Sequence, residues 1–125
     1  MNIGILVKAL NDLAKECYSN AASKGFHEED DNPHRFAEYI ANLHGEVSEL
    51  WEAHRKGALH DACNKVKRME ELGIPGLTNA EEEIADIIIR ALDTAEGIEI
   101  KNIGLAIQFK MAYNRTRPYM HGKKC

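Results

Sequence analysis

Apolar residues at helical spacing most strongly limit the fold of this 125-residue chain. In the first two dozen residues they recur three or four positions apart, which gathers them on one face of a helix. The same spacing returns in two later segments, and no segment alternates convincingly as a β-strand does. The three periodic segments are followed by glycines, where helices commonly end: Gly25, Gly57 and Gly97. The pattern predicts an all-α fold.

Start and stop signals divide the chain into five predicted helices. These cover residues 3–24, 32–56, 59–72, 78–96 and 101–116. Asn32 and Pro33 suit the N-cap and first position of the second helix. The fourth begins at Thr78 or Asn79, because Thr78 with Glu81 and Asn79 with Glu82 both match a capping box. Helices joined by short connections predict a bundle of four to five helices.

Composition and charge narrow the class of protein. With 44% hydrophobic and 29% charged residues, the chain reads as one globular domain over residues 1–125, with a flexible tail at 118–125. Its net charge of −4 gives no general attraction to nucleic acid or to anionic membranes. No signal peptide and no apolar run of about 20 residues is present. Three cysteines without a CxxC motif favour reduced thiols in the cytoplasm: Cys17, Cys63 and Cys125.

Two acidic pairs carry the main functional signal. Glu46 and Glu49 lie in GEVSEL, and Glu83 and Asp86 lie in EEEIADIII. Residues three apart on a helix are surface neighbours, so each pair presents two carboxylates side by side. If the two helices face each other, four carboxylates converge and repel one another unless a divalent cation binds. Oxygen ligands favour a hard ion, Mg²⁺ first and Mn²⁺ next.

The position of these acids around each helix distinguishes a possible metal site from an ordinary solvated helix face. Both pairs lie beside the apolar stripe of their helix, whereas solvated charges belong opposite it. A single pair of this kind is more typical of a solvated helix face, and Arg90 offers Asp86 a structural ion pair. Glu81 and Glu82 are expected in solvent near the helix N-terminus, and the acidic run 28–31 in a solvated loop. Two flanking pairs on two long helices favour the site.

A cationic segment follows the second acidic pair. Lys110, Asn114 and Arg117 are spaced to share one helix face if the helix extends that far. Lysine and arginine suit phosphate oxygens, and Asn114 can donate to a phosphate or read a sugar or base edge. The alternative is a helix that ends in cations because they favour its dipole. We favour the functional interpretation for Lys110 and Asn114.

In this order, the motifs resemble those of the MazG-like all-α nucleoside triphosphate pyrophosphatases. The matching text is GEVSELWEAHRKG, then EEEIADIIIRALDTAEGIEI, then FKMAYNRTRPYMHGKK, and the resemblance covers residues 32–124. The chain departs from the family pattern in one respect. Residues 59–72 are inserted between the two acidic pairs, which bears on the connection between the helices and on substrate choice.

The resemblance implies a function as well as a fold. It implies Mg²⁺-dependent hydrolysis of an NTP or dNTP, with Mn²⁺ as a substitute, to a nucleoside monophosphate and pyrophosphate. It assigns metal binding and catalysis to four acids: Glu46, Glu49, Glu83 and Asp86. It assigns substrate contacts to three residues near the end of the chain: Lys110, Asn114 and Arg117. It further implies a homo-oligomer, a dimer or tetramer, whose sites form near subunit contacts.

Two other classes compete with this interpretation. A non-catalytic helical module that binds a nucleotide or a protein would keep the bundle without turnover. A di-iron carboxylate bundle needs Glu-x-x-His on two of its helices. No glutamate in this chain is followed by histidine three residues later, which argues against the di-iron class.

Overall fold

The computed structural model describes residues 2–124, and within them the regular secondary structure is helical. The elements are α1 (Ile3–Ser23), α2 (Arg35–Arg55), α3 (Val66–Glu71), α4 (Asn79–Gly97), α5 (Ile103–Arg115) and a short 3-10 helix, η1 (Tyr119–Gly122). The all-α prediction is confirmed. In this part of the chain, no helix is both long and apolar enough to cross a membrane. Cys125, the last residue of the predicted flexible tail, lies outside the described residues.

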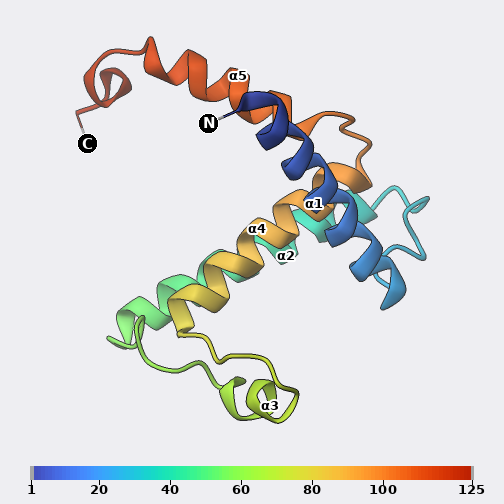
Figure 1. Ribbon diagram of the computed structural model, residues 1–125, viewed down its shortest axis with the longest axis vertical. Coiled ribbons are helices and arrows are strands. Elements are labelled where there is room, and N and C mark those ends of the chain that lie inside the picture. Colours follow the sequence, from blue (N-terminus) through green and yellow to red (C-terminus); the bar gives the residue numbers. More distant parts are fainter. Residues whose placement is uncertain (1, 125) are drawn as a thin grey trace.

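The antiparallel pair of α2 and α4 forms the centre of the molecule. In Figure 1 these two helices lie side by side, α1 crosses α4, and α5 runs along α1. The short α3 lies at the far end of the pair, in the connection from α2 to α4. A small core of Ala14, Cys17 and Leu92, with Ile103 packed against it, joins α1 to α4. Since both acidic pairs belong to α2 and α4, their packing decides whether the acids meet.

Of the two capping boxes predicted at the start of α4, the structure forms the one between Thr78 and Glu81. The Thr78 hydroxyl accepts the backbone N–H of Glu81 at 3.2 Å, and the Glu81 carboxylate accepts the N–H of Thr78 at 3.0 Å. These reciprocal bonds satisfy two N–H groups that a helix start otherwise leaves unpaired. The capping box therefore fixes the register of α4, and with it the direction of Glu83 and Asp86.

The predicted start of α2 is wrong by a few residues. The helix begins at Arg35, and its cap residue His34 makes no capping hydrogen bond through its side chain. The Asn32 side chain instead accepts the backbone N–H of His34 at 2.9 Å. Asparagine favours such local turns as readily as helix caps, so the residues around Pro33 form a turn before the helix.

The predicted helix over residues 59–72 is also too long, because only its second half is helical. The backbone before α3 pairs with the start of α4: Leu59 accepts the N–H of Ala80 at 2.8 Å, and Asp61 accepts the N–H of Asn79 at 2.9 Å. Carbonyls used in this way are not available for a helical ladder. The connection therefore ties the end of α2 to the start of α4.

The apolar stripes of α2 and α4 are only partly covered within one chain. Phe36 is 51% exposed and Val47 48% on α2, while Ile84 is 45% exposed and Ile88 50% on α4. Tyr39 is the buried residue of α2. The periodicity identified which faces are apolar, but the single chain supplies too few helices to cover them.

Candidate metal centre

Three of the four predicted acids meet between α2 and α4. Glu46 and Glu49 from α2 and Glu83 from α4 each offer a carboxylate oxygen, and these oxygens lie within 4.8 Å of one another. In the described part of the chain, no other three His, Cys, Asp or Glu side chains come this close. We call these three residues the carboxylate cluster. The convergence follows from i, i+3 spacing on one helix and the close packing of the next.

Glu83 is the most buried member of the carboxylate cluster. Burial, the adjacent Glu49 carboxyl and the charges of Glu82 and Glu46 raise the pKa of Glu83 to about 7. The residue is only 9% exposed, and its Oε2 atom has no hydrogen-bond partner. A buried oxygen without a partner is costly, and a positive ion would relieve both that cost and the repulsion.

The geometry and chemistry of the cluster suit a hard divalent cation. Mg²⁺ binds oxygen at about 2.1 Å, so ligands on opposite sides of the ion lie roughly 4 Å apart. Carboxylate oxygens within 4.8 Å of one another need only a small closure to reach that separation. An all-oxygen set selects Mg²⁺ or Mn²⁺ over softer metals. The residues present therefore fit the ion that the sequence predicts.

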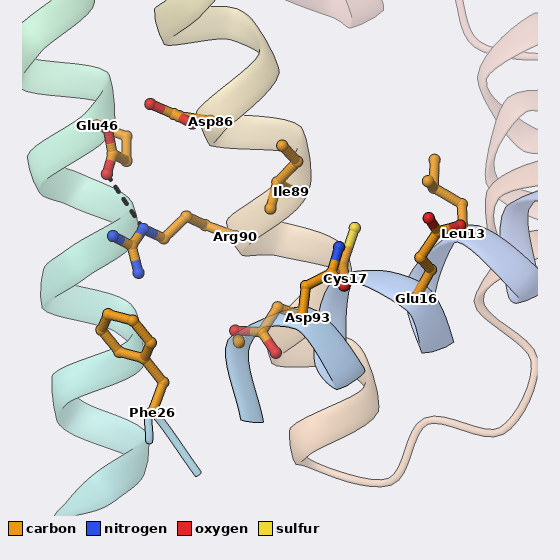
Figure 2. A pocket seen from close by; sticks show the side chains of 11 residues that line it. Leu13, Glu16, Cys17, Phe26, Glu46, Asp86, Ile89, Arg90 and Asp93 are labelled. Carbon is orange, nitrogen blue, oxygen red and sulfur yellow. Dashed lines mark hydrogen bonds and ion pairs between the residues drawn. The ribbon is translucent and has the colours of Figure 1, made fainter. Parts of the chain in front are cut away.

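Asp86, the fourth predicted ligand, lies beside the cluster but outside its 4.8 Å limit. Burial and the charge of Glu46 raise the pKa of Asp86, against the opposing charges of Lys65 and Arg90. Figure 2 shows Asp86 on α4 with its carboxylate directed toward α2, near Glu46. The structure thus brings Asp86 into the electrostatic field of the cluster without joining it to the three oxygens.

A cavity of about 330 Å³ adjoins the acids between α1, α2 and α4. Figure 2 shows part of its lining, with Asp86, Ile89 and Arg90 on α4, Glu46 on α2, and Phe26 below the Arg90 guanidinium. Its volume lies within the range of small-molecule pockets, which are mainly apolar with a few fixed polar groups. Because Glu46 belongs to both the cavity and the carboxylate cluster, a molecule in the cavity would lie beside the residues that could hold the ion.

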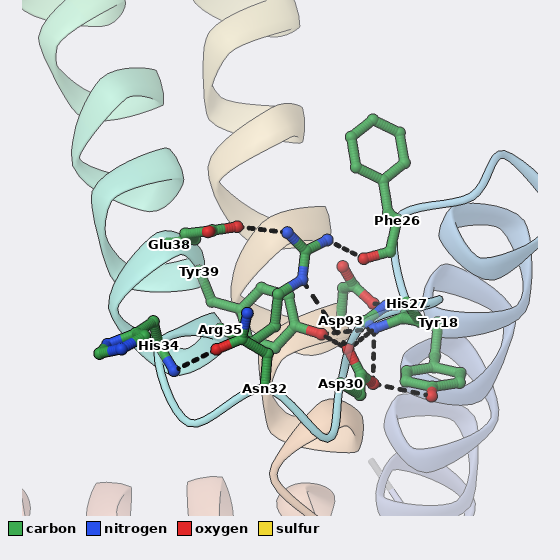
Figure 3. A network of polar contacts seen from close by, with 10 residues as sticks. All are labelled: Tyr18, Phe26, His27, Asp30, Asn32, His34, Arg35, Glu38, Tyr39 and Asp93. Carbon is green, nitrogen blue, oxygen red and sulfur yellow. Dashed lines mark hydrogen bonds and ion pairs between the residues drawn. The ribbon is translucent and has the colours of Figure 1, made fainter.

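A buried histidine holds the α1–α2 loop against the helices (Figure 3). His27 Nε2 lies 2.6 Å from Asp93 on α4, and its Nδ1 lies 2.9 Å from Asp30 and 2.7 Å from the Tyr39 hydroxyl. Its ring stacks on Tyr18 with centroids 3.9 Å apart. The side chain is 4% exposed. This network fixes the loop that presents Phe26 to the cavity.

The sequence pattern did not predict the His27 network. Asp30 belongs to the acidic run expected in a solvated loop, yet it contacts His27, Tyr18 and Tyr39. Burial and the bond to Asp30 raise the pKa of Tyr39 to about 12, so its hydroxyl keeps its proton. Asp93, one helical period beyond Asp86 on the same side of α4, was the only available signal. Nothing in the sequence indicated which loop residue it would meet.

Glu82 was also expected in solvent, and that prediction is wrong. The residue is 7% exposed, and its carboxylate accepts a hydrogen bond from Lys65. Lys65 lies in the connection before α3, where a helix had been predicted. The pairing depends on the irregular path of that connection, so helical phase alone could not reveal it.

The predicted phosphate-binding residues lie apart from the acids in the single chain. Figure 1 shows α5 leading away from the α2–α4 pair. Lys110 Nζ and the Arg117 guanidinium lie 4.8 Å and 5.7 Å from the centre of the Tyr113 ring. Arg117 follows the end of α5, and Asn114 Oδ1 is buried without a hydrogen-bond partner. No hydrogen bond or ion pair among residues 2–124 joins the three to the carboxylate cluster.

Comparison with known proteins identifies no relative of this chain. No family model, curated protein or solved structure matches the chain. The MazG-like resemblance therefore rests on the sequence motifs, and what the structure adds is the carboxylate cluster and the cavity beside it.

Proposed function

We propose that the chain is a MazG-like nucleoside triphosphate pyrophosphohydrolase that requires Mg²⁺ or Mn²⁺. One observation carries the proposal: three carboxylates from two helices converge, and the buried Oε2 of one of them, Glu83, lacks a partner. Structural ion pairs do not normally leave such an oxygen unpaired. A cation site beside a nucleoside-sized cavity is the arrangement that a triphosphate substrate needs.

We assign metal binding and proton transfer to the acidic residues between α2 and α4. The carboxylate cluster would hold the ion, with Asp86 beside it as the fourth ligand. The bound ion supplies positive charge to the phosphate oxygens and activates water. Glu46 or Glu49 would orient the attacking water and accept its proton. Water oxygen bonds to the α-phosphorus, the bond to the α–β bridging oxygen breaks, and pyrophosphate leaves.

The cavity would hold the nucleoside part of the substrate. Phe26 offers an aromatic face, and the Arg90 guanidinium lies 5.8 Å from the centre of that ring. Asp93 and Asn20 add polar groups to the lining. Because Glu46 and Asp86 line the same space, a nucleoside here would extend its phosphates toward the carboxylate cluster.

The cations of α5 and the uncovered apolar faces favour a homo-oligomer, a dimer or tetramer. Phe109 is 65% exposed and Tyr113 57% on α5, in addition to the exposed stripes of α2 and α4. A second copy would cover these faces, and its Lys110 and Asn114 could then approach the phosphates. Light scattering coupled to gel filtration tests the assembly.

The free, buried Cys17 and Cys63 suit a reducing compartment, so we propose that the protein resides in the cytoplasm.

Pyrophosphate release from NTPs and dNTPs, followed with Mg²⁺, Mn²⁺ or excess chelator, tests the activity. Turnover should need metal and should be lost in Glu49→Gln and Asp86→Asn, with the helical circular dichroism unchanged. Glu29→Gln, which alters an exposed loop acid, is the control. Full turnover in the two site variants would refute the assignment. Nucleotide affinity by calorimetry without any product would support the non-catalytic binding module instead.

A further inference from the structure

The segment between α2 and α4 places a lysine against Glu82 on α4, one residue before Glu83 of the carboxylate cluster. Lys65 Nζ donates a hydrogen bond to the carboxylate of Glu82, the residue directly before Glu83. This bond and the charges of Glu82, Asp86 and Glu83 raise the pKa of Lys65. The ammonium group therefore stands within the field of the acids that we propose to hold the cation.

The backbone around Lys65 is anchored on both sides. Cys63 is 4% exposed, and its N–H donates to Leu77 at 2.9 Å. Val66 packs so tightly against Gly76 that a Cβ atom on Gly76 would lie 2.8 Å from a Val66 methyl carbon. The backbone of Lys65 is thus held between the anchored residues Cys63 and Val66. Its position beside α4 follows from the fold of the inserted segment.

The Lys65 ammonium keeps donors available while paired. A lysine has three N–H donors, and Glu82 is the one carboxylate that forms an ion pair with Lys65 among the described residues. The side chain of Lys65 is 62% exposed, whereas that of Glu82 is only 9% exposed. A carboxylate this buried needs its counter-charge, so Lys65 is held beside Glu82, the residue before Glu83. Its remaining donors face solvent, where a ligand can reach them.

We propose that Lys65 contacts the polyphosphate of the substrate, donating from its remaining N–H groups to a phosphate oxygen while it stays paired with Glu82. The inference rests on the proposed function, because it places the phosphates at the carboxylate cluster. A fixed ammonium there binds the triphosphate and the leaving pyrophosphate through charge-assisted hydrogen bonds. The inserted segment 59–72 would then contribute directly to substrate binding.

Calorimetry with inorganic pyrophosphate and Mn²⁺, on the full-length protein, tests the contact without requiring turnover. Lys65→Met should weaken pyrophosphate binding about 10-fold or more, since a hydrogen bond to a charged group contributes roughly 1.5–3 kcal/mol. Lys67→Met is the matched control, because Lys67 is exposed in the same segment and forms no ion pair among the described residues. Lys67→Met should bind within about 2-fold of wild type by the same reasoning.

A double variant separates phosphate contact from simple neutralisation of Glu82. If Lys65 only offsets the buried charge, Lys65→Met with Glu82→Gln should restore binding, which would overturn the inference. Weak binding in the double variant, at an unchanged melting temperature, supports phosphate contact. Wild-type protein that fails to bind pyrophosphate with Mn²⁺ also overturns the inference. Tight binding without turnover of any NTP would contradict the proposed function and leave the Lys65 contact supported.

Discussion

Arg90 on α4 donates its Nε–H to the Oε1 atom of Glu46 on α2 at 3.1 Å. The pair links the two helices that carry the carboxylate cluster and lies on the wall of the cavity (Figure 2). The sequence suggested Arg90 as a partner for Asp86, one turn away on its own helix. The packing of α2 against α4 gives it a partner on the other helix instead. Arg90 therefore offsets part of the negative charge of the cluster and orients one of its carboxylates.

Replacing Arg90 should make the protein depend more strongly on metal. Arg90→Met leaves Glu46, whose side chain is 13% exposed, without its partner. A lost bond of this kind costs about 1–3 kcal/mol, so the melting temperature in chelator should fall by several degrees. The rise on adding Mn²⁺ should exceed that of wild type, because the cluster is then more negative. Thermal melts with chelator and with Mn²⁺ measure both effects.

Arg68→Met provides the control for this measurement. Arg68 pairs with Glu71 on α3, and both side chains are largely exposed. Such a surface pair contributes roughly 0–1 kcal/mol, so little change is expected with or without metal. A metal-induced rise in Arg90→Met no larger than that in wild type would contradict the idea that Arg90 offsets the cluster's charge.

The raised pKa of Glu83 predicts how stability depends on pH without metal. Unfolded Glu83 loses its proton near pH 4.5, while the folded residue keeps it until about pH 7. The folded state therefore binds more protons in this window, and the free energy of unfolding falls as pH rises from 4.5 to 7. At about 1.4 kcal/mol per pKa unit, the loss from this group has an upper bound of about 3.5 kcal/mol.

Urea unfolding in chelator, at several pH values, tests this prediction. Glu83→Gln should flatten the decline, because the amide does not titrate and relieves the repulsion. Glu29→Gln, an exposed loop residue, should keep the wild-type slope. With Mn²⁺ present, stabilisation of wild type should grow through the same window, because the metal binds the ionised carboxylate. An identical pH slope in wild type and Glu83→Gln would show that Glu83 is not the responsible group.

The sequence predicted what depends on local structure. Helical periodicity gave the number and type of the elements, and the Thr78 capping box fixed the start of α4. Helical phase also placed Glu46, Glu49 and Glu83 beside the contact between α2 and α4. These are properties of single helices with regular geometry, so a residue's position in the sequence determines which way it points.

The parts that the sequence did not predict depend on irregular backbone. Lys65 reaches Glu82 because residues 59–63 pair with the start of α4 instead of forming a helix. His27 reaches Asp93 because the α1–α2 loop folds back over the helices. Such contacts join residues far apart in the chain through loops that have no periodic pattern. The exposure of the apolar stripes of α2 and α4 was also not predicted, because periodicity identifies an apolar face but not how much of it is covered.

Breaking the contact between His27 and Asp93 should destabilise the fold. Both groups are largely buried, and the atoms lie 2.6 Å apart. Removing one partner of a buried hydrogen bond leaves the other group unsatisfied, which costs about 1–3 kcal/mol. His27→Gln and Asp93→Asn should each destabilise the fold by an amount of this order in urea unfolding. The double variant should be destabilised by clearly less than the sum of the single changes, since the two residues interact directly. Additive losses would show that they act independently.

The junction of α1 and α5 offers a steric test of the fold with a matched control. Gly104 lies so close to α1 that an added Cβ atom would be 2.5 Å from the carbonyl oxygen of Val7. Gly104→Ala should therefore push α5 from α1 and cost about 1–3 kcal/mol, as overpacking typically does. Gly45, in the middle of α2, has no atom within 4 Å of an added Cβ, so Gly45→Ala should stabilise by about 0.5–1 kcal/mol through helix propensity. Urea unfolding of the two alanine variants should move in opposite directions. Equal stability in Gly104→Ala and wild type would mean that α5 does not pack on α1 at this distance.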